Sequence, residues 1–350
     1  MDIKILNANE ELLGIIDEYK SFLWVHRYYE CGDFELYCKA TPETLSLLRS
    51  GNFVARDDDS QVCIIENIRV DTDAEEGNYI TASGRCMKSI LDRRIVWYQT
   101  TLYAKIETFI QMILDKNVIS PSNADRKIPN FTFENTGTLP EYVEMQMDGD
   151  TIYEVLVNVC KQFKYGFEVA LKDGNFTLKI YKGADRSYNQ TENPYVVFST
   201  DFDNLTQSTY IFRNSDYKNV ALVKGEGSGT DREDYTVGTA AGLDRRETFT
   251  DAQSISSNGG AISESNYYQL LAAKGNRALS SMRGSENLEG TIIETGQYQY
   301  KKDYFLGDVV QIKNEYGIEA QARIIEIIES DDDTGHTLIP TFSTWEVTAI

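Results

Sequence analysis

The amino-acid sequence predicts an α+β protein that is mainly β, with two similar β-barrel domains, a small helix–hairpin domain and a helical insertion. Three observations lead to this prediction. Short stretches of alternating apolar and polar residues, separated by turn residues, lie towards both ends of the chain. A helical pattern followed by a hairpin pattern lies in the middle. The 22 tyrosines favour strands, and 350 residues are enough for two or three domains.

One three-strand pattern occurs twice, which predicts that the two ends of the chain are copies of one β unit. Unrelated β meanders can also resemble one another, and the sequence leaves that alternative open. If the repeat is real, a trimer would present six barrels in a ring and match a hexameric tube by symmetry. The first copy spans residues 51–54, 63–68 and 79–82, and the second spans 307–310, 322–328 and 337–340.

The first β-barrel domain is expected at residues 1–98. Alternating residues predict several short strands, for example at 34–38, where Phe34, Leu36 and Cys38 alternate with charged residues. A short helix is expected after Thr41, because a capping hydroxyl is followed by Pro42 at the first helical position. Several short strands with one small helix are typical of a barrel or sandwich.

The helix–hairpin domain is expected at residues 99–194. Its first helix, 102–117, has apolar residues at spacings of three and four, and Thr100 or Thr101 is expected to cap it. The second helix, 151–165, begins with a capping box and is expected to end at Gly166. Alternating residues on both sides of an Asp-Gly turn then predict a hairpin at 167–181.

The second β-barrel domain is expected at residues 195–250 and 285–350. Residues 251–284 are expected to interrupt it as an insertion that contains a loop and a helix. The helix is predicted at 263–282 from apolar residues on one side.

Composition excludes several classes of protein. The net charge of −21 disfavours stable binding to nucleic acid or to anionic membranes. No apolar run approaches 18 residues, so no membrane span is expected, and the first residues do not have the pattern of a signal peptide. The five cysteines lack a C-x-x-C motif and predict reduced, buried thiols, with a Cys31–Cys38 disulfide as the alternative.

No catalytic residue, cofactor site or metal site is predicted. The two histidines, His26 and His336, are in no nucleophile-elbow context and read as ordinary strand residues. The acidic segment 71–75 begins like a calcium loop but departs from it at Glu76 and Ala82, so a solvated turn is expected. The glycines of 225–229 lack the Lys-Ser/Thr pair of a phosphate loop. No carboxylate pair stands out as the pair of a glycosidase.

Four arginines stand out in so acidic a chain: Arg93, Arg94, Arg245 and Arg246. They are candidates for ion pairs between subunits, because the planar guanidinium suits carboxylates. The alternative is ordinary surface pairing, which contributes little to stability.

Several short motifs resemble the siphophage Gp37-like tail protein family, whose members resemble the baseplate hubs of phage tails. The likeness covers nearly the whole chain. It rests on Gly84, on Leu91-Asp92-Arg93-Arg94-Ile95-Val96, on 126–129, on 28–36, on 242–249, and on Leu306-Gly307-Asp308-Val309-Val310. Asp308 therefore joins the four arginines as a family-motif or interface candidate.

The resemblance implies a homotrimeric structural hub, not an enzyme, that closes the distal end of a tail tube. Implied partners are the tube, distal tail and tape-measure proteins on one side, and fibre, spike or lysin proteins on the other. DNA would only pass through the channel. The implied location is the virion tail tip, assembled in the host cytoplasm. Alternatives are a tail-like bacteriocin particle, a receptor- or carbohydrate-binding tail module, and a cell-wall hydrolase.

Overall fold

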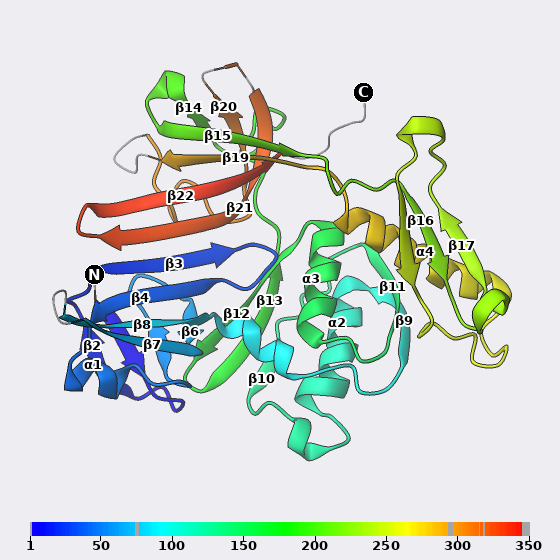
Figure 1. Cartoon of the computed structure of the whole chain (residues 1–350), viewed down its shortest axis with the longest axis horizontal. Helices are drawn as coiled ribbons and strands as arrows, with labels where there is room; N and C mark the ends of the chain where they lie inside the picture. Colours follow the sequence, from blue (N-terminus) through cyan, green and yellow to red (C-terminus); the bar gives the residue numbers. More distant parts are fainter. Residues whose placement is uncertain (1, 74–76, 293–296, 315, 318, 345–350) are drawn as a thin grey trace.

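The computed structural model describes the chain except for residues 1, 74–76, 293–296, 315, 318 and 345–350. The fold is mainly β, as predicted. Figure 1 shows a large sheet assembly on one side, two helices in the centre and a smaller sheet with one helix on the other side. None of the described helices is long and apolar enough to cross a membrane.

The first β unit, residues 2–85, contains two groups of strands. The first is a four-stranded sheet in the order β2 (Leu12–Ile16), β1 (Ile3–Leu6), β5 (Phe53–Ala55), β6 (Val62–Ile64). The second group is antiparallel, in the order β3 (Ser21–Arg27), β4 (Asp33–Lys39), β8 (Gly77–Arg85), β7 (Asn67–Asp73). Helix α1 (Pro42–Leu47) begins after Thr41, whose side chain caps it as expected. Trp24, Phe22 and Phe34 fill the core between these elements.

The second β unit contains six strands that follow one another in the order β14 (Val197–Ser199), β20 (Val309–Lys313), β21 (Glu319–Asp332), β22 (Gly335–Thr344), β19 (Ser285–Ile292), β15 (Leu205–Arg213). Its core is separate from the first and contains Phe198, Tyr304 and Phe342. Two hydrophobic cores therefore support two β units.

The two β units share one strand order. In the first unit the order is β1, β5, then β6 and β7, which together correspond to one strand, then β8, β4 and β3. In the second unit the order is β14, β20, β21, β22, β19, β15. The long strand β21 pairs with β20 through residues 319–323 and with β22 through residues 322–332, whereas in the first unit β6 pairs with β5 and β7 pairs with β8. One pair differs in direction, because β1 and β5 are antiparallel whereas β14 and β20 are parallel. The shared order supports the predicted repeat.

One pairing joins the units. Residues 326–332 of β21 lie antiparallel to residues 21–27 of β3, so that strands of both units form one ten-stranded sheet. This sheet runs β15-β19-β22-β21-β3-β4-β8-β7, with β20 and β14 attached beside β21. Within the described residues its order does not close on itself, so the two closed barrels of the sequence analysis stay a prediction.

The helix–hairpin unit contains β9 (Thr100–Lys105), α2 (Ile106–Leu114), β10 (Phe131–Phe133) and β11 (Tyr142–Met147) before its second helix. The expected start of the first helix at 102 is wrong. Residues 100–105 are a strand paired with β11, and Lys105, not Thr100 or Thr101, precedes the helix. Leu102 is buried and its strand neighbours are more exposed, which is the alternation of a strand. A π-helical turn (Asp115–Ile119) extends α2.

The second helix and the hairpin agree closely with the prediction. Helix α3 (Ile152–Phe163) has the expected capping box of Thr151 and Glu154. The left-handed residue at its end is Lys164, with φ 63°, and Gly166 instead begins β12 (Gly166–Lys172). Strand β13 (Asn175–Tyr181) completes the hairpin. The turn residues Asp173 and Gly174 both have positive φ, which an Asp-Gly pair allows.

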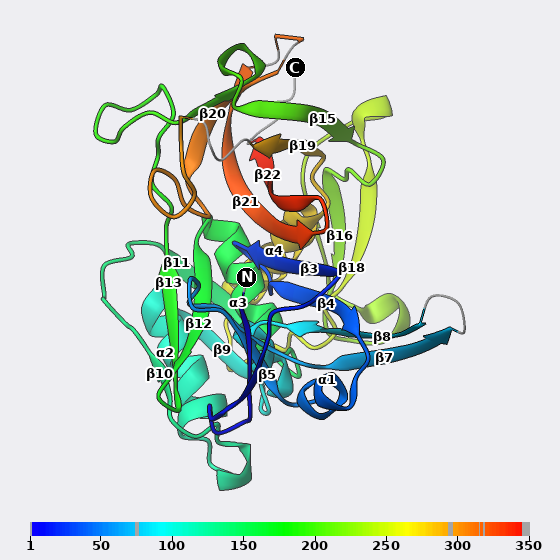
Figure 2. The same cartoon turned by 90° about the vertical axis from the view of Figure 1, so that its left-hand side faces the viewer.

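An inserted unit occupies residues 214–284, between β15 and β19. Strands β17 (Asp234–Val237), β16 (Val220–Lys224) and β18 (Glu247–Asp251) form a sheet of their own, and α4 (Glu264–Ser281) packs on it (Figures 1 and 2). The sequence analysis placed these strands in the second barrel and only 251–284 in the insertion. The difference arises because the alternation of a short strand does not identify the sheet that it joins.

Candidate assembly interface

The ten-stranded sheet ends in two strands that have a partner on one side only. β7 pairs with β8, and β15 pairs with β19; no other described strand pairs with either. Both carry exposed apolar side chains, with Ile68 41% and Val70 48% exposed on β7, and Tyr210 39% and Phe212 49% exposed on β15. An unpaired edge with apolar side chains is a template for a strand of another chain.

The shared strand order relates these two edges to each other. β7 occupies in the first unit the place of the outer part of β21 in the second unit, and β15 occupies the place of β3. Inside the chain, β21 and β3 pair with each other. The chain therefore contains one contact between the two units, the pairing of β21 with β3. The edges β7 and β15 correspond to the two sides of such a contact, but they do not pair with each other in the chain. Burial agrees, because Ile327 on β21 is fully buried whereas all of β7 is exposed.

A buried polar cluster stabilises the completed contact. His26 on β3 lies 2.8 Å from Asp59 and 3.6 Å from Glu329 on β21. Glu329 also forms an ion pair of 2.8 Å with Arg56, whose side chain is almost fully buried. Lys301, from the second unit, contacts Asp59 at 2.8 Å and Glu329 at 3.4 Å. The cluster thus joins the two units by charge as well as by backbone pairing.

The cluster shifts the pKa values of its members. Burial lowers the pKa of His26, but hydrogen bonds to Asp59 and Glu329 outweigh this effect, so that its pKa lies above the ordinary value. Burial raises the pKa of Glu329, yet His26, Lys301 and Arg56 lower it to about 2. The pKa of Asp59 is also lowered, because His26 and Lys301 outweigh its burial. The cluster is therefore most stable with both carboxylates charged and His26 protonated.

The same cluster includes the donor types of a metal site, because ligand atoms of His26, Asp59 and Glu329 lie within 4.8 Å of one another. Two cations already contact these carboxylates, however: Lys301 contacts both and Arg56 contacts Glu329. The positive charges of Lys301 and Arg56 balance the negative charges of these carboxylates, as a metal ion would. The arrangement is an ion-pair network between two β units.

The predicted arginines lie at two separate places. Arg93 is exposed, and Arg94 donates to the carbonyls of Arg93 and Arg126 within its own unit. In the inserted unit, Arg245 pairs with Glu247 at 2.5 Å, and Arg246 donates to the Asn214 carbonyl at 3.0 Å. The structure does not bring the two pairs into one site. An interface role for them stays a prediction.

Asp308 is buried, with 2% of its surface exposed. Its carboxylate accepts from the Ala184 and Phe305 backbone N–H groups at 2.7 and 3.0 Å, and from Arg186 Nε at 2.7 Å. These contacts fasten the segment after β13 to the second β unit. Asp308 therefore has a structural role inside the chain.

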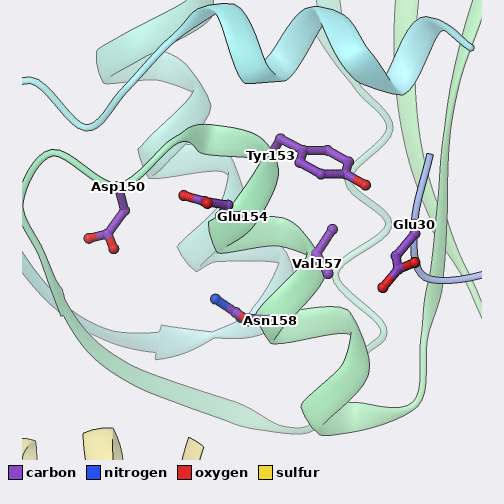
Figure 3. Close-up of a pocket in the computed structure, with 6 residues that line it drawn as sticks. All are labelled: Glu30, Asp150, Tyr153, Glu154, Val157 and Asn158. Carbon is purple, nitrogen blue, oxygen red and sulfur yellow. The ribbon is translucent and has the colours of Figure 1, made fainter. Parts of the chain in front are cut away.

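An acidic groove of about 370 Å³ lies along α3 (Figure 3). Glu30 faces the helix from a neighbouring loop, and its carboxylate pairs with Lys161. Glu154 belongs to the helix cap, and the Tyr153 hydroxyl accepts from the Cys31 N–H at 2.9 Å. These groups serve the fold, and no pairing of a nucleophile with a base is evident among them. The groove is lined by Glu30, Asp150, Tyr153, Glu154, Val157 and Asn158.

Comparison with known proteins gives one family and several solved structures. Residues 2–343 match the family model described as Siphovirus ReqiPepy6 Gp37-like protein. No curated protein matches the chain.

The similar solved structures share the fold at low sequence identity. The prophage tail protein gp18 from Listeria monocytogenes has 13% identity and a TM-score of 0.55 over 99% of this chain and 96% of that one. The 43 kDa tail protein of prophage MuSo2 from Shewanella oneidensis has 14% identity and a TM-score of 0.56 over 98% of each chain. A tail protein from Neisseria meningitidis has 13% identity and a TM-score of 0.55, with 99% and 96% covered.

Proposed function

Because the chain belongs to the Siphovirus ReqiPepy6 Gp37-like protein family, we propose that it is a structural hub of a phage or prophage tail. In this proposal three copies form a ring that closes the tail tube and connects it to fibre, spike or lysin components. The protein does not turn over a substrate. Its other partners are the tube, distal tail and tape-measure proteins.

The complementary edges β7 and β15 carry this proposal. If β7 of one copy pairs with β15 of the next, the contact between copies repeats the contact between β21 and β3 within a copy. Such a head-to-tail contact forms a closed ring when its rotation closes. Three copies then present six β units in equivalent positions, which suits a sixfold tube. The contact would also cover Ile68, Val70, Tyr210 and Phe212, which are exposed in the single chain.

The charge suits a channel through which DNA passes. A net charge of −21 repels phosphates, so that DNA does not adhere to the walls. The proposed location is the virion tail tip, with assembly in the host cytoplasm. Strong binding of duplex DNA at physiological salt would contradict this part of the proposal.

The test is the native mass of edge variants. The wild-type protein should have three times the mass of the 39.7 kDa chain in native mass spectrometry. Lysine on an edge strand disfavours pairing. One variant therefore carries Ile68→Lys and Val70→Lys on β7, and another carries Tyr210→Lys and Phe212→Lys on β15. Each should be monomeric.

Mixing the two edge variants gives the decisive result. The β7 variant keeps a functional β15, and the β15 variant keeps a functional β7, so the mixture should form dimers that cannot grow or close. A matched control is Met112→Lys on α2, where a 38% exposed apolar side chain lies away from both edges. That variant should stay trimeric. Edge variants that remain trimeric, or a mixture that stays monomeric, would refute the head-to-tail ring.

A second candidate function is binding of carbohydrate on a host surface. Tyr103 on β9 and Tyr142 on β11 are 68% and 51% exposed, and their rings stack with centroids 5.2 Å apart. Exposed aromatic rings of this kind can cover the apolar face of a sugar. A glycan array on wild type and Tyr103→Ala tests it, and an array without hits removes this candidate while leaving the hub proposal unchanged.

A further inference from the structure

Two cysteines that are far apart in sequence lie in contact inside the first β unit. Cys31 is in the turn between β3 and β4, and Cys86 directly precedes the 3₁₀ helix Met87–Arg93. Both are buried, and their Sγ atoms lie 3.1 Å apart. The Cys86 N–H also donates to the Gly32 carbonyl at 2.8 Å, which fastens the two segments together. A disulfide bond is about 2.05 Å long, so the sulfurs need to approach by only about 1 Å.

The surroundings make the two thiols unequal. The Lys88 ammonium group is buried beside them and donates to the Arg27 and Glu30 carbonyls at 2.7 and 2.8 Å. Burial raises the pKa of Cys86, but the hydrogen bond from Cys31 and the charge of Lys88 lower it by a larger amount, so that it lies at about 6. The pKa of Cys31 is raised by this hydrogen bond and by burial. Cys86 is thus the thiol of the pair that loses its proton more readily, and the thiolate is the reactive form of cysteine.

A small cavity borders Cys86. It has a volume of about 70 Å³, and Cys86, Lys88 and Phe167 are among the residues that line it. A cavity needs roughly 10–15 Å³ to hold one water molecule, so a hydroperoxide of two oxygen atoms fits. Cys86 is therefore buried, but it borders a space that a small oxidant can occupy.

We propose that Cys31 and Cys86 are an oxidation site, a dithiol that hydrogen peroxide converts to a disulfide. Cys86 Sγ attacks one peroxide oxygen, the O–O bond breaks, and the leaving hydroxide takes a proton to become water. Cys31 Sγ then attacks the sulfur of the Cys86 sulfenic acid, and the hydroxyl leaves as water with the Cys31 proton. In total two thiols lose two electrons and two protons, and peroxide is reduced to two water molecules.

The bond would form after the protein leaves the cytoplasm, and this timing rests on the proposed function. Thiols stay reduced in the cytoplasm and form disulfides outside it. A virion protein experiences both conditions, during assembly and after lysis. The disulfide would close the segment 31–86, which contains β4 to β8, and so stabilise the first β unit mainly by constraining its unfolded chain. β7, one of the two proposed ring edges, lies in that segment.

The test uses the purified full chain. After treatment with hydrogen peroxide, unfolding and alkylation, mass spectrometry should count three alkylated cysteines in place of five. Digestion without reduction should yield one linked peptide pair that contains Cys31 and Cys86. The thermal midpoint should rise by several degrees, and dithiothreitol should reverse the rise. Five alkylated cysteines, a different pair, or Cys86 oxidised without a bond would overturn the proposal.

Two variants test the roles of the sulfurs. In Cys31→Ala the sulfenic acid on Cys86 should persist and be trapped by dimedone when the oxidised protein is unfolded, whereas Cys86→Ala should show neither sulfenic acid nor disulfide. Cys38→Ser is the matched control, because Cys38 is a buried thiol of the same β unit whose pKa is raised by burial alone, and this variant should still form the bond. All of these measurements use the isolated chain, so their failure leaves the ring proposal standing. A thiol count on purified particles then tests the timing.

Discussion

Tyr28 of the first β unit packs against both the helix–hairpin unit and the second β unit. We predict that the stability of the protein depends on this contact. Its side chain is fully buried, and its hydroxyl lies 3.2 Å from the Tyr181 carbonyl at the end of the hairpin. A Cβ atom added to Gly166 of the helix–hairpin unit would lie 2.3 Å from the ring, and one added to Gly307 of the second β unit would lie 2.2 Å from it. Alanine at either glycine should therefore destabilise the protein by displacing this ring.

The structure offers a matched control that separates packing from backbone strain. Gly307 has φ +92° and Gly51 has φ +91°, but an added Cβ at Gly51 meets no atom within 4 Å. Gly51→Ala should therefore cost only the left-handed strain, about 1–2 kcal/mol. Gly166 has no positive φ, so Gly166→Ala should cost only the overlap, about 1–3 kcal/mol. Gly307→Ala combines both effects and should cost about 2–5 kcal/mol.

Urea unfolding followed by tyrosine and tryptophan fluorescence measures these costs. The midpoint should fall most for Gly307→Ala and less for Gly166→Ala and Gly51→Ala. In a Tyr28→Leu background the ring is gone, so the added cost of Gly307→Ala should fall to that of Gly51→Ala, a coupling that a double-mutant cycle reports. Equal costs of Gly307→Ala and Gly51→Ala in the wild-type background would show that Tyr28 does not couple the units.

Three further predictions concern the buried polar cluster between the two β units and the cap of helix α3. His26→Asn should cost more stability at pH 6 than at pH 9. Burial lowers the pKa of His26, but Asp59 and Glu329 raise it overall. The contribution of His26 to stability is therefore complete below about pH 6.5 and is lost as the pH rises through the pKa of the folded state. Glu329→Gln should cost about 3–5 kcal/mol at pH 7, because it removes the buried carboxylate that faces Arg56, His26 and Lys301, and Arg56 keeps only its pair with the more exposed Asp58 among its two ion pairs. That cost should shrink as pH falls from about 4 towards 2, because burial raises the pKa of Glu329 but the neighbouring cations lower it to about 2; acid titration of both proteins by circular dichroism checks this. Thr151→Ala should cost about 1 kcal/mol in urea unfolding, because it removes the α3 cap.

Local patterns predicted the elements that depend on neighbours in sequence. The capping box of α3, the Asp-Gly hairpin and the proline start of α1 all involve residues within a few positions of one another. Pairing over long distances was not predictable in the same way. The strand at Thr100–Lys105 depends on β11, which lies about forty residues later, and its apolar residues also continue the spacing of the following helix.

The candidate interface was predictable only as a repeat. The three-strand pattern indicated two similar units, but alternation is the same in an edge strand and an inner strand, so β7 was not recognisable as an edge. His26 read as an ordinary strand residue because Glu329, its neighbour in the cluster, lies near the other end of the chain. The repeated three-strand pattern does not pair them either, because His26 lies before its first copy and Glu329 directly follows the strand 322–328 of its second copy.

Linking two units in one chain has a consequence that six separate units would lack. In the proposed ring the β units alternate, and each type carries different additions. The first is followed by the helix–hairpin unit, and only the second contains the inserted unit between β15 and β19. The sixfold surface of strands could therefore match a tube, while the additions repeat only three times and match threefold partners. The buried cluster of His26, Asp59 and Glu329 stabilises the contact inside each chain, whereas the proposed contact through β7 and β15 would form only with a neighbouring copy.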